Sequence, residues 1–224
     1  MIAILQSYSS MLLGALGKTL LLTLLSLLFA MIIGMIFALM NVGRNRVLNC
    51  IGTIYVDAVR GVPLIVLAYF IYFGVPSGMK MMGATDFRLS ALQAGTIALA
   101  MNCGAYMAEI IRAGIQSVDK GQMEAGRSVG LTYATTMRCV IIPQAFKNVL
   151  PALGNELITL LKETSVVTVI GLRDLTKGAL IIQSKTYQAF VPFFAIAAMY
   201  LVMVLGLSWL MGKLERRMRQ SDLR

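Results

Sequence analysis

The sequence predicts an all-α protein that crosses a membrane five times and carries one polar loop between its third and fourth spans. Of the 224 residues, 58% are apolar and 13% are charged, whereas about 25% of the residues in a soluble domain are charged. The apolar residues form runs long enough to cross a bilayer. The one long polar interruption covers residues 112–147. We therefore expect a single membrane domain, residues 1–224.

The first predicted span covers residues 19–43, which include no charged residue and are long enough to cross a bilayer with some tilt. Ala30, Gly34 and Ala38 recur every fourth residue, so this helix presents a ridge of small side chains on which another helix can pack closely. Arg44 and Arg46 follow the span directly. Since basic residues gather at cytoplasmic ends, we place this end in the cytoplasm and the N-terminus outside.

The second span is predicted at residues 52–75, and a short loop at 76–88 follows it. Asp57 and Arg60 lie three residues apart near its start, on one face of a helix. We expect them to form a structural ion pair rather than to contact a substrate.

The third span is predicted at residues 89–111. It carries one helical stripe of small and polar residues, at Gly95, Ala98, Asn102, Ala105 and Glu109. Such a stripe cannot face lipid, and it must face other helices or a water-filled path.

The fourth span, predicted at residues 149–172, is the least apolar of the five. Ionisable groups at this depth cost roughly 2.5–3.5 kcal/mol each, so they should face protein or water. From the third and fourth spans we select seven candidates for the lining of a transport path: Asn102, Glu109, Glu156, Lys162, Glu163, Thr164 and Ser165. The alternative for each one is a structural role, as a polar group that only holds neighbouring helices together.

The fifth span is predicted at residues 187–212, which include no charge, after a loop at 173–185. Five spans place the two ends of the chain on opposite sides of the membrane. The segments then assigned to the cytoplasm hold twelve Lys and Arg residues, and the external segments hold six. This bias favours an outside N-terminus and a cytoplasmic C-terminus, and it places the loop 112–147 in the cytoplasm.

Within the polar loop, local signals predict two short helices. Asp119 is a good N-cap with Gln122 three residues later, so a helix can begin at Lys120. Gly130 provides a left-handed stop. Thr132 can cap a second helix, which Pro143 must end or kink.

The loop also resembles a known sequence pattern. The spacing of Glu124, Ala125, Gly126, Gly130 and Pro143 is similar to the "EAA" loop in the permease subunits of ATP-binding-cassette importers, with Gly126 in place of the second Ala. Three further phrases, at residues 60–64, 102–109 and 153–165, resemble the polar amino acid permeases of that group.

The resemblance implies a multi-pass permease in a bacterial plasma membrane that imports polar or charged L-amino acids. It implies that the loop holds a coupling helix, with Glu124, Ala125, Gly126, Gly130 and Pro143 at the contact with an ATPase. The expected partners are a second permease chain, identical or sister, two cytoplasmic ATPase subunits and an external substrate-binding protein. The permease itself is then no enzyme, and ATP and Mg are bound by the ATPase.

The main alternative is a secondary transporter or channel that works alone and uses intramembrane carboxylates. Such carriers often contain an internal repeat, and we find none here. Residues 126–130 match the G-x-S-x-G motif of hydrolases, but the chain has no histidine, so we explain the two glycines by close backbone approach and helix termination. With no histidine and no paired cysteine motif, we expect no metal site. The net charge of +10 is explained by cytoplasmic basic residues rather than by nucleic-acid binding.

Overall fold

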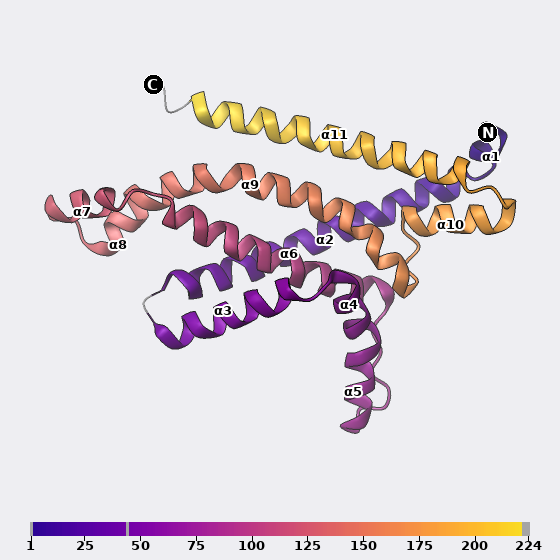
Figure 1. Cartoon of the computed structure of the whole chain (residues 1–224), viewed down its shortest axis with the longest axis horizontal. Helices are drawn as coiled ribbons and strands as arrows, with labels where there is room; N and C mark the ends of the chain where they lie inside the picture. Colours follow the sequence, from indigo (N-terminus) through magenta and orange to yellow (C-terminus); the bar gives the residue numbers. More distant parts are fainter. Residues whose placement is uncertain (1, 44, 221–224) are drawn as a thin grey trace.

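The computed structural model describes residues 2–43 and 45–220, and every regular element in these ranges is a helix. The all-α prediction is therefore confirmed for this part of the chain. The long helices lie side by side in an elongated bundle, with the loop 112–147 at one end and the N-terminus near the other (Figure 1). Arg44, which helped to orient the first span, lies outside the described residues, as do residues 221–224 of the basic tail.

The first long helix, α2 (Ser9–Val42), follows the short α1 (Ile2–Ser7) and packs along α6 (Ala91–Gln116). Its predicted ridge of small residues forms the contact. Ala30 and Ala38 are fully buried, and a Cβ at Gly34 would lie 2.7 Å from the Cβ of Met107 on α6. The two backbones can approach this closely because glycine faces the larger side chain at each of these points, Gly34 facing Met107 and Gly104 facing Ile33.

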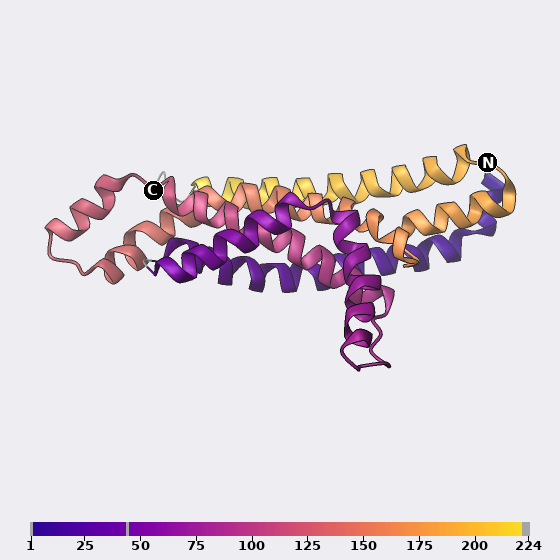
Figure 2. The same ribbon diagram turned by 60° about the horizontal axis from the view of Figure 1, so that its bottom comes forward.

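The second span differs from its prediction, because residues 52–75 do not form one continuous helix. Helix α3 (Arg46–Gly61) ends before Pro63, where Val62 is extended, as is usual for a residue before proline. The chain then continues through α4 (Leu64–Tyr69), a π-helical turn (Phe70–Gly74) and α5 (Val75–Met81). Figures 1 and 2 show α3 lying beside the bundle while α5 projects away from it. The predicted loop 76–88 thus begins with helix.

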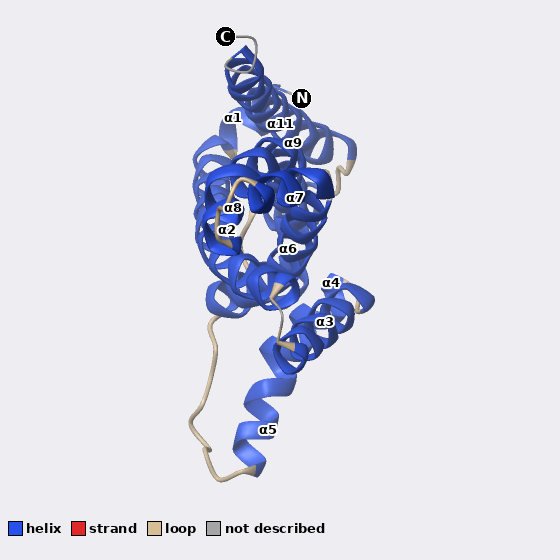
Figure 3. Cartoon of the chain, turned by 90° about the vertical axis from the view of Figure 1, so that its left-hand side faces the viewer, coloured by secondary structure: helices blue, strands red, loops and turns tan. Residues whose placement is uncertain are grey.

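Helix α6 lies in the centre of the bundle, and helices on several sides cover it (Figure 3). A capping box begins it, because the Ser90 side chain accepts from the Gln93 backbone N–H and the Gln93 side chain accepts from the Ser90 N–H. The predicted small and polar stripe faces protein: Ala98 and Ala105 are fully buried, and Asn102 is 5% exposed.

The polar loop contains α7 (Lys120–Ser128) and α8 (Tyr133–Thr136). The chain then stays helical through a π-helical turn (Met137–Ile141), α9 (Ile142–Glu163) and a 3₁₀ segment (Thr164–Ile170). Gly171, with φ of 89°, ends this run. The sequence predicts that the fourth span begins at residue 149, but the corresponding helix, α9, begins earlier, at Ile142.

The predicted loop 173–185 is instead mostly helical, because α10 covers Leu175–Thr186. Its N-cap is Asp174, which is fully buried and accepts from the backbone N–H groups of Thr176 and Lys177. The hydroxyl of Thr168 also donates to Asp174. The last helix, α11 (Phe190–Gln220), begins after Tyr187, whose φ of 56° ends α10.

Within the described ranges, four helical segments are long and apolar enough to cross a membrane: Ser9–Val42, Leu64–Met81, Ala91–Gln116 and Phe190–Met218. Helix α9 is not among them. It carries Asn155, Glu156, Lys162 and Glu163, which lower its hydropathy. Four spans are thus recognised by composition, and the remaining predicted span, the fourth, corresponds to the polar helix α9.

Candidate functional site

The polar loop forms a compact helical hairpin whose caps match the prediction. The Asp119 carboxylate accepts the Gly121 N–H at 2.6 Å at the start of α7. Gly130 adopts φ of 88° after its end. Thr132 caps α8 by accepting the N–H of Thr135 at 3.2 Å. Both predicted helices are therefore confirmed, with Lys120 as the first residue of α7.

Gly126 lies where α7 touches α8. A Cβ at this position would be 2.4 Å from the Cγ2 of Thr136, which is fully buried. Such a distance is not possible without displacement of one helix, so the contact requires glycine. Glu124 and Ala125, the neighbouring residues of the EAA-like phrase, are exposed on α7. The hairpin therefore buries one part of the phrase and leaves the other exposed.

The sequence analysis predicted that Pro143 ends or kinks the second helix of the loop. In the structure, Pro143 does not end the helix. It lies in the first turn of α9, directly after the π-helical turn in which the Ile142 N–H donates to the Met137 carbonyl. The wider turn accommodates the proline within a continuous helix.

A small apolar core joins the hairpin to both membrane helices that flank it. Val118, Ile141 and Ala145 are buried together, and Met123 of α7 packs against them. Beyond this core, α6 and α9 touch closely, since a Cβ at Gly114 would lie 1.9 Å from the Cγ2 of Val149. The hairpin and the adjoining ends of α6 and α9 therefore form one packed unit.

The same two helices meet again deeper in the bundle through polar side chains. The Asn102 amide on α6 donates to Glu163 Oε2 on α9 at 3.2 Å. Glu156 is 9% exposed and interacts electrostatically with Glu163, with the Cys103 thiol as a further neighbour. The structure thus brings together three of the seven candidates for a path lining, Asn102, Glu156 and Glu163.

The remaining four candidates lie elsewhere or have local partners. The hydroxyls of Thr164 and Ser165 donate to the carbonyls of Leu161 and Lys162, each at 2.7 Å, as part of the helix end. The Lys162 side chain is exposed. Glu109 forms an ion pair with Arg112 of its own helix at 2.5 Å, so it belongs to a different cluster.

Asp57 and Arg60, predicted as a structural pair, have separate surroundings. No ion pair joins these two residues in the described part of the chain, although they share one face of α3. The guanidinium of Arg60 lies over the ring of Tyr106 instead, 5.0 Å from its centroid. Tyr106 is on α6, so the cation–π contact ties Arg60 to another helix.

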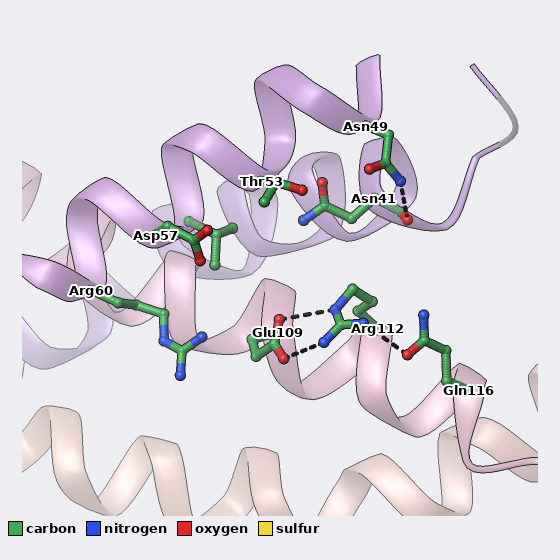
Figure 4. Close-up of a pocket in the computed structure, with 9 residues that line it drawn as sticks. Asn41, Asn49, Thr53, Asp57, Arg60, Glu109, Arg112 and Gln116 are labelled. Atoms are coloured by element: carbon green, nitrogen blue, oxygen red, sulfur yellow. Dashed lines mark hydrogen bonds and ion pairs between the residues drawn. The ribbon is translucent and has the colours of Figure 1, made fainter. Parts of the chain in front are cut away.

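Asp57 and Arg60 line a pocket of about 400 Å³ that opens between α2, α3 and α6. Figure 4 shows Asn49, Thr53, Asp57 and Arg60 along α3 on one side of it. Sequence analysis missed Asn49 and Thr53, although the spacing of four residues to Asp57 is visible in the sequence and predicts a shared face.

The other side of the pocket consists of Glu109, Arg112 and Gln116 from α6. Arg112 holds this side together, because it donates to Glu109 and, at 2.7 Å, to Gln116 Oε1. The sequence analysis selected neither Arg112 nor Gln116 as a site residue. Both lie at the end of the third span, where polar and charged residues in contact with solvent are common. In the described residues, no group of three potential metal ligands occurs.

Comparison with known proteins identifies relatives over almost the whole chain. The family "binding-protein-dependent transport system inner membrane component" matches residues 30–220. The probable glutamine ABC transporter permease protein GlnM of Bacillus subtilis is 38% identical, covering 98% of this chain and 99% of that protein. The arginine transport system permease protein ArtQ of the same organism is 37% identical and covers 94% and 93%. The glutamine transport system permease protein GlnP of Escherichia coli is 35% identical and covers 90% of each chain.

Solved structures show the same fold. A crystal structure of an amino acid ABC transporter with histidines includes a chain that is 46% identical, with a TM-score of 0.87 and coverage of 95% and 96%. The MetNI methionine ABC transporter in an inward-facing conformation has a TM-score of 0.79 at 21% identity, which supports the fold alone.

Proposed function

This chain belongs to the family of binding-protein-dependent transport system inner membrane components, and from that premise we propose that it imports polar amino acids. It is the permease subunit of an ATP-binding-cassette importer and a multi-pass protein of the bacterial inner membrane. The observation that carries the substrate class is the likeness to three permeases named for glutamine or arginine, across nearly their full lengths.

The cargo passes the buried polar group formed by Asn102, Glu156 and Glu163. These side chains supply amide and carboxylate groups in a region where lipid-facing positions must be apolar. Their contact joins α6 to α9, so a relative movement of these two helices at this depth opens or closes the group. Lys162, Thr164 and Ser165 lie next to Glu163 in the chain and border the same region.

The chain crosses the membrane five times, with α9 as the polar fourth helix, its N-terminus outside and its C-terminus in the cytoplasm. The excess of Lys and Arg in the segments on one side supports this orientation. The polar residues of α9 lower its hydropathy. The helix can carry them within the membrane because they face the path or other helices instead of lipid.

In this orientation α7 is the coupling helix and contacts a cytoplasmic ATPase subunit. Glu124 and Ala125 are exposed for docking, while Gly126, Gly130 and the helix caps keep α7 compact. ATP and Mg belong to the ATPase, and this chain binds no cofactor. Two ATPase subunits, a second permease chain and an external substrate-binding protein complete the importer.

The transport cycle follows from the packed unit at the loop. When ATP draws the ATPase subunits together, α7 moves, and the apolar core around Val118 and Ile141 passes the movement to α6 and α9. The pathway then opens outward and accepts an amino acid from the binding protein. Hydrolysis returns α7, and the pathway opens to the cytoplasm.

The proposal is tested with the complete transporter reconstituted into vesicles without an ion gradient. Uptake of labelled L-glutamine and L-arginine is measured with ATP and with a non-hydrolysable analogue. We expect accumulation of at least one of them only with ATP. Accumulation driven by a proton or sodium gradient, with no requirement for ATP, would instead establish a secondary transporter.

A further inference from the structure

The pocket between α3 and α6, called the charged pocket below, is distinct from the group formed by Asn102 and Glu163. It lies near the start of α3, at Asn49, and near the end of α6 that leads to the polar loop, at Gln116. Its volume of about 400 Å³ falls within the range of roughly 300–1,000 Å³ that is usual for small-molecule sites. An amino acid fits into such a space.

The charges in the pocket balance, but they are not all paired. Glu109 and Arg112 neutralise each other in one ion pair. Asp57 and Arg60 carry the other two charges, and in the described part of the chain neither has an ion-pair partner. The pocket therefore offers a carboxylate and a guanidinium without an ion-pair partner, the guanidinium lying over the Tyr106 ring, and its formal net charge is zero.

The polar face of α3 cannot lie against lipid. Asn49, Thr53, Asp57 and Arg60 extend over about 16 Å of helix at 1.5 Å per residue, while Ile51 and Ile54 are exposed on another face. A polar stripe of this length inside a bilayer must line water or protein. Figure 4 shows this stripe across the pocket from Glu109, Arg112 and Gln116 of α6.

Asn41 of α2 also lines the pocket and is only 8% exposed. Its Oδ1 has no hydrogen-bond partner among the described residues, but it lies against the backbone of Gly52 on α3, where a Cβ would be 2.0 Å away. The groups that the pocket lacks are therefore a cation beside Asp57 and an anion beside Arg60.

We propose that the charged pocket is a second amino-acid site, on the cytoplasmic side of the path, that binds the zwitterionic main-chain groups of the cargo before release. The ammonium group binds Asp57, and the carboxylate binds Arg60. A zwitterion satisfies both free charges without changing the net charge, whereas a simple anion or cation leaves one of them unmatched. The site recognises the part common to all amino acids, so it does not select the side chain. This inference rests on the proposed amino acid transport.

The test uses a thiol in the pocket of the complete transporter, in nucleotide-free nanodiscs. Thr53→Cys is introduced together with Cys50→Ser and Cys139→Ser, because these two native cysteines are exposed. The rate of labelling by a small charged thiol reagent is measured with L-glutamine, with 4-aminobutanamide, which lacks the carboxylate, and with glutaramic acid, which lacks the amine. Should Thr53→Cys abolish ATP-driven uptake, Gln116→Cys replaces it as the reporter.

At ten times its half-saturating concentration, L-glutamine should slow labelling about tenfold by mass action, and neither analogue should do so. Asp57→Asn should remove the protection while Glu163→Gln retains it. Equal protection by all three compounds, protection by none, or protection that survives Asp57→Asn would overturn the proposal.

Two further outcomes would also overturn it by showing a different occupant. Protection without amino acid in phosphatidylethanolamine nanodiscs, absent in phosphatidylglycerol, would identify a zwitterionic lipid headgroup. Disulfide formation between the reporters of two permease chains would identify a second copy against this face. ATP-driven uptake of L-glutamine in the same preparation is a separate readout, so failure of the pocket site is distinguishable from failure of the transport function.

Discussion

The polar loop and the buried group around Asn102 use the same two helices in different ways. At the loop, α6 and α9 are joined by close packing of Val149 against Gly114, and α8 packs on α7 in the same way, with Thr136 against Gly126. Deeper in the bundle, α6 and α9 are joined by a polar contact, the hydrogen bond that Asn102 donates to Glu163. The first region should therefore be sensitive to added volume and the second to changed charge. In the proposed cycle, the closely packed contact at the loop transmits the movement of α7 to α6 and α9, and the polar contact deeper in the bundle changes the surroundings of the cargo.

The largest effect is expected from Glu124→Lys, which reverses a charge on the exposed face of α7 without touching the core. We expect normal insertion in the membrane but uptake reduced at least about tenfold, with ATP hydrolysis that no longer depends on the binding protein. A lost interaction of about 1.4 kcal/mol gives a factor of ten. The measurement is uptake and ATPase activity on one preparation, with Gln122→Lys on the same helix as the matched control. Normal uptake by Glu124→Lys would remove α7 as the coupling element.

The requirement for shape at the hairpin is tested by Gly126→Ala. The new Cβ lies 2.4 Å from the Thr136 methyl group, and overpacking of this kind typically costs about 1–3 kcal/mol. We expect a lower thermal midpoint of the purified complex and weaker binding of the ATPase.

The double variant Gly126→Ala with Thr136→Ala provides the rescue, because it removes the methyl group that the new Cβ meets. Gly206→Ala is the matched control, since a Cβ there meets nothing within 4 Å. If the double variant is as impaired as the single one, the contact between α7 and α8 is not the reason for glycine at this position.

The importance of charge deeper in the bundle is tested by Glu163→Gln. The amide oxygen can still accept from Asn102, so the geometry is kept while the negative charge is lost. We expect little change in stability, and a change of up to about tenfold in the KM for L-arginine, equivalent to about 1.4 kcal/mol, with a smaller change for L-glutamine. Equal effects on both amino acids would indicate that the carboxylate only holds α6 to α9.

The smallest effect is expected from Thr132→Ala, which removes the N-cap of α8. The loss of such a cap costs about 1 kcal/mol, and the Thr136 contact with Gly126 remains. We expect a shift of a few degrees in the thermal midpoint and uptake near that of the unchanged protein. A loss as large as that of Glu124→Lys would show that the hairpin itself is only marginally folded.

Local signals in the sequence predict the helices and caps of the loop well. Asp119, Gly130 and Thr132 act through neighbouring backbone groups, so their roles follow from spacing alone. The ridge of Ala30, Gly34 and Ala38 is also predictable, because small residues at this interval have few other uses in a membrane helix.

Other features depend on contacts between distant segments, and spacing cannot predict them. Asp57 and Arg60 satisfy the rule for an ion pair within a helix, but Tyr106 on another helix competes for the guanidinium. Likewise, the charged pocket requires three helices to meet, and only one of its faces is visible in the sequence. Helix α10 is an exception, because its N-cap Asp174 acts through the neighbouring backbone groups of Thr176 and Lys177, and the sequence analysis missed this local signal.

The central claim is that the loop and the adjoining ends of α6 and α9 move as one unit, and one crosslink tests it directly. Ser117 and Asn148 join the two helices beside the loop through a side-chain hydrogen bond of 3.0 Å. Ser117→Cys and Asn148→Cys are combined with Cys50→Ser and Cys139→Ser in the complete transporter and joined by a short thiol crosslinker. We predict ATP-driven uptake close to that before crosslinking, because the joined helices already move together. ATP hydrolysis that continues while uptake is abolished by the crosslink would contradict the account.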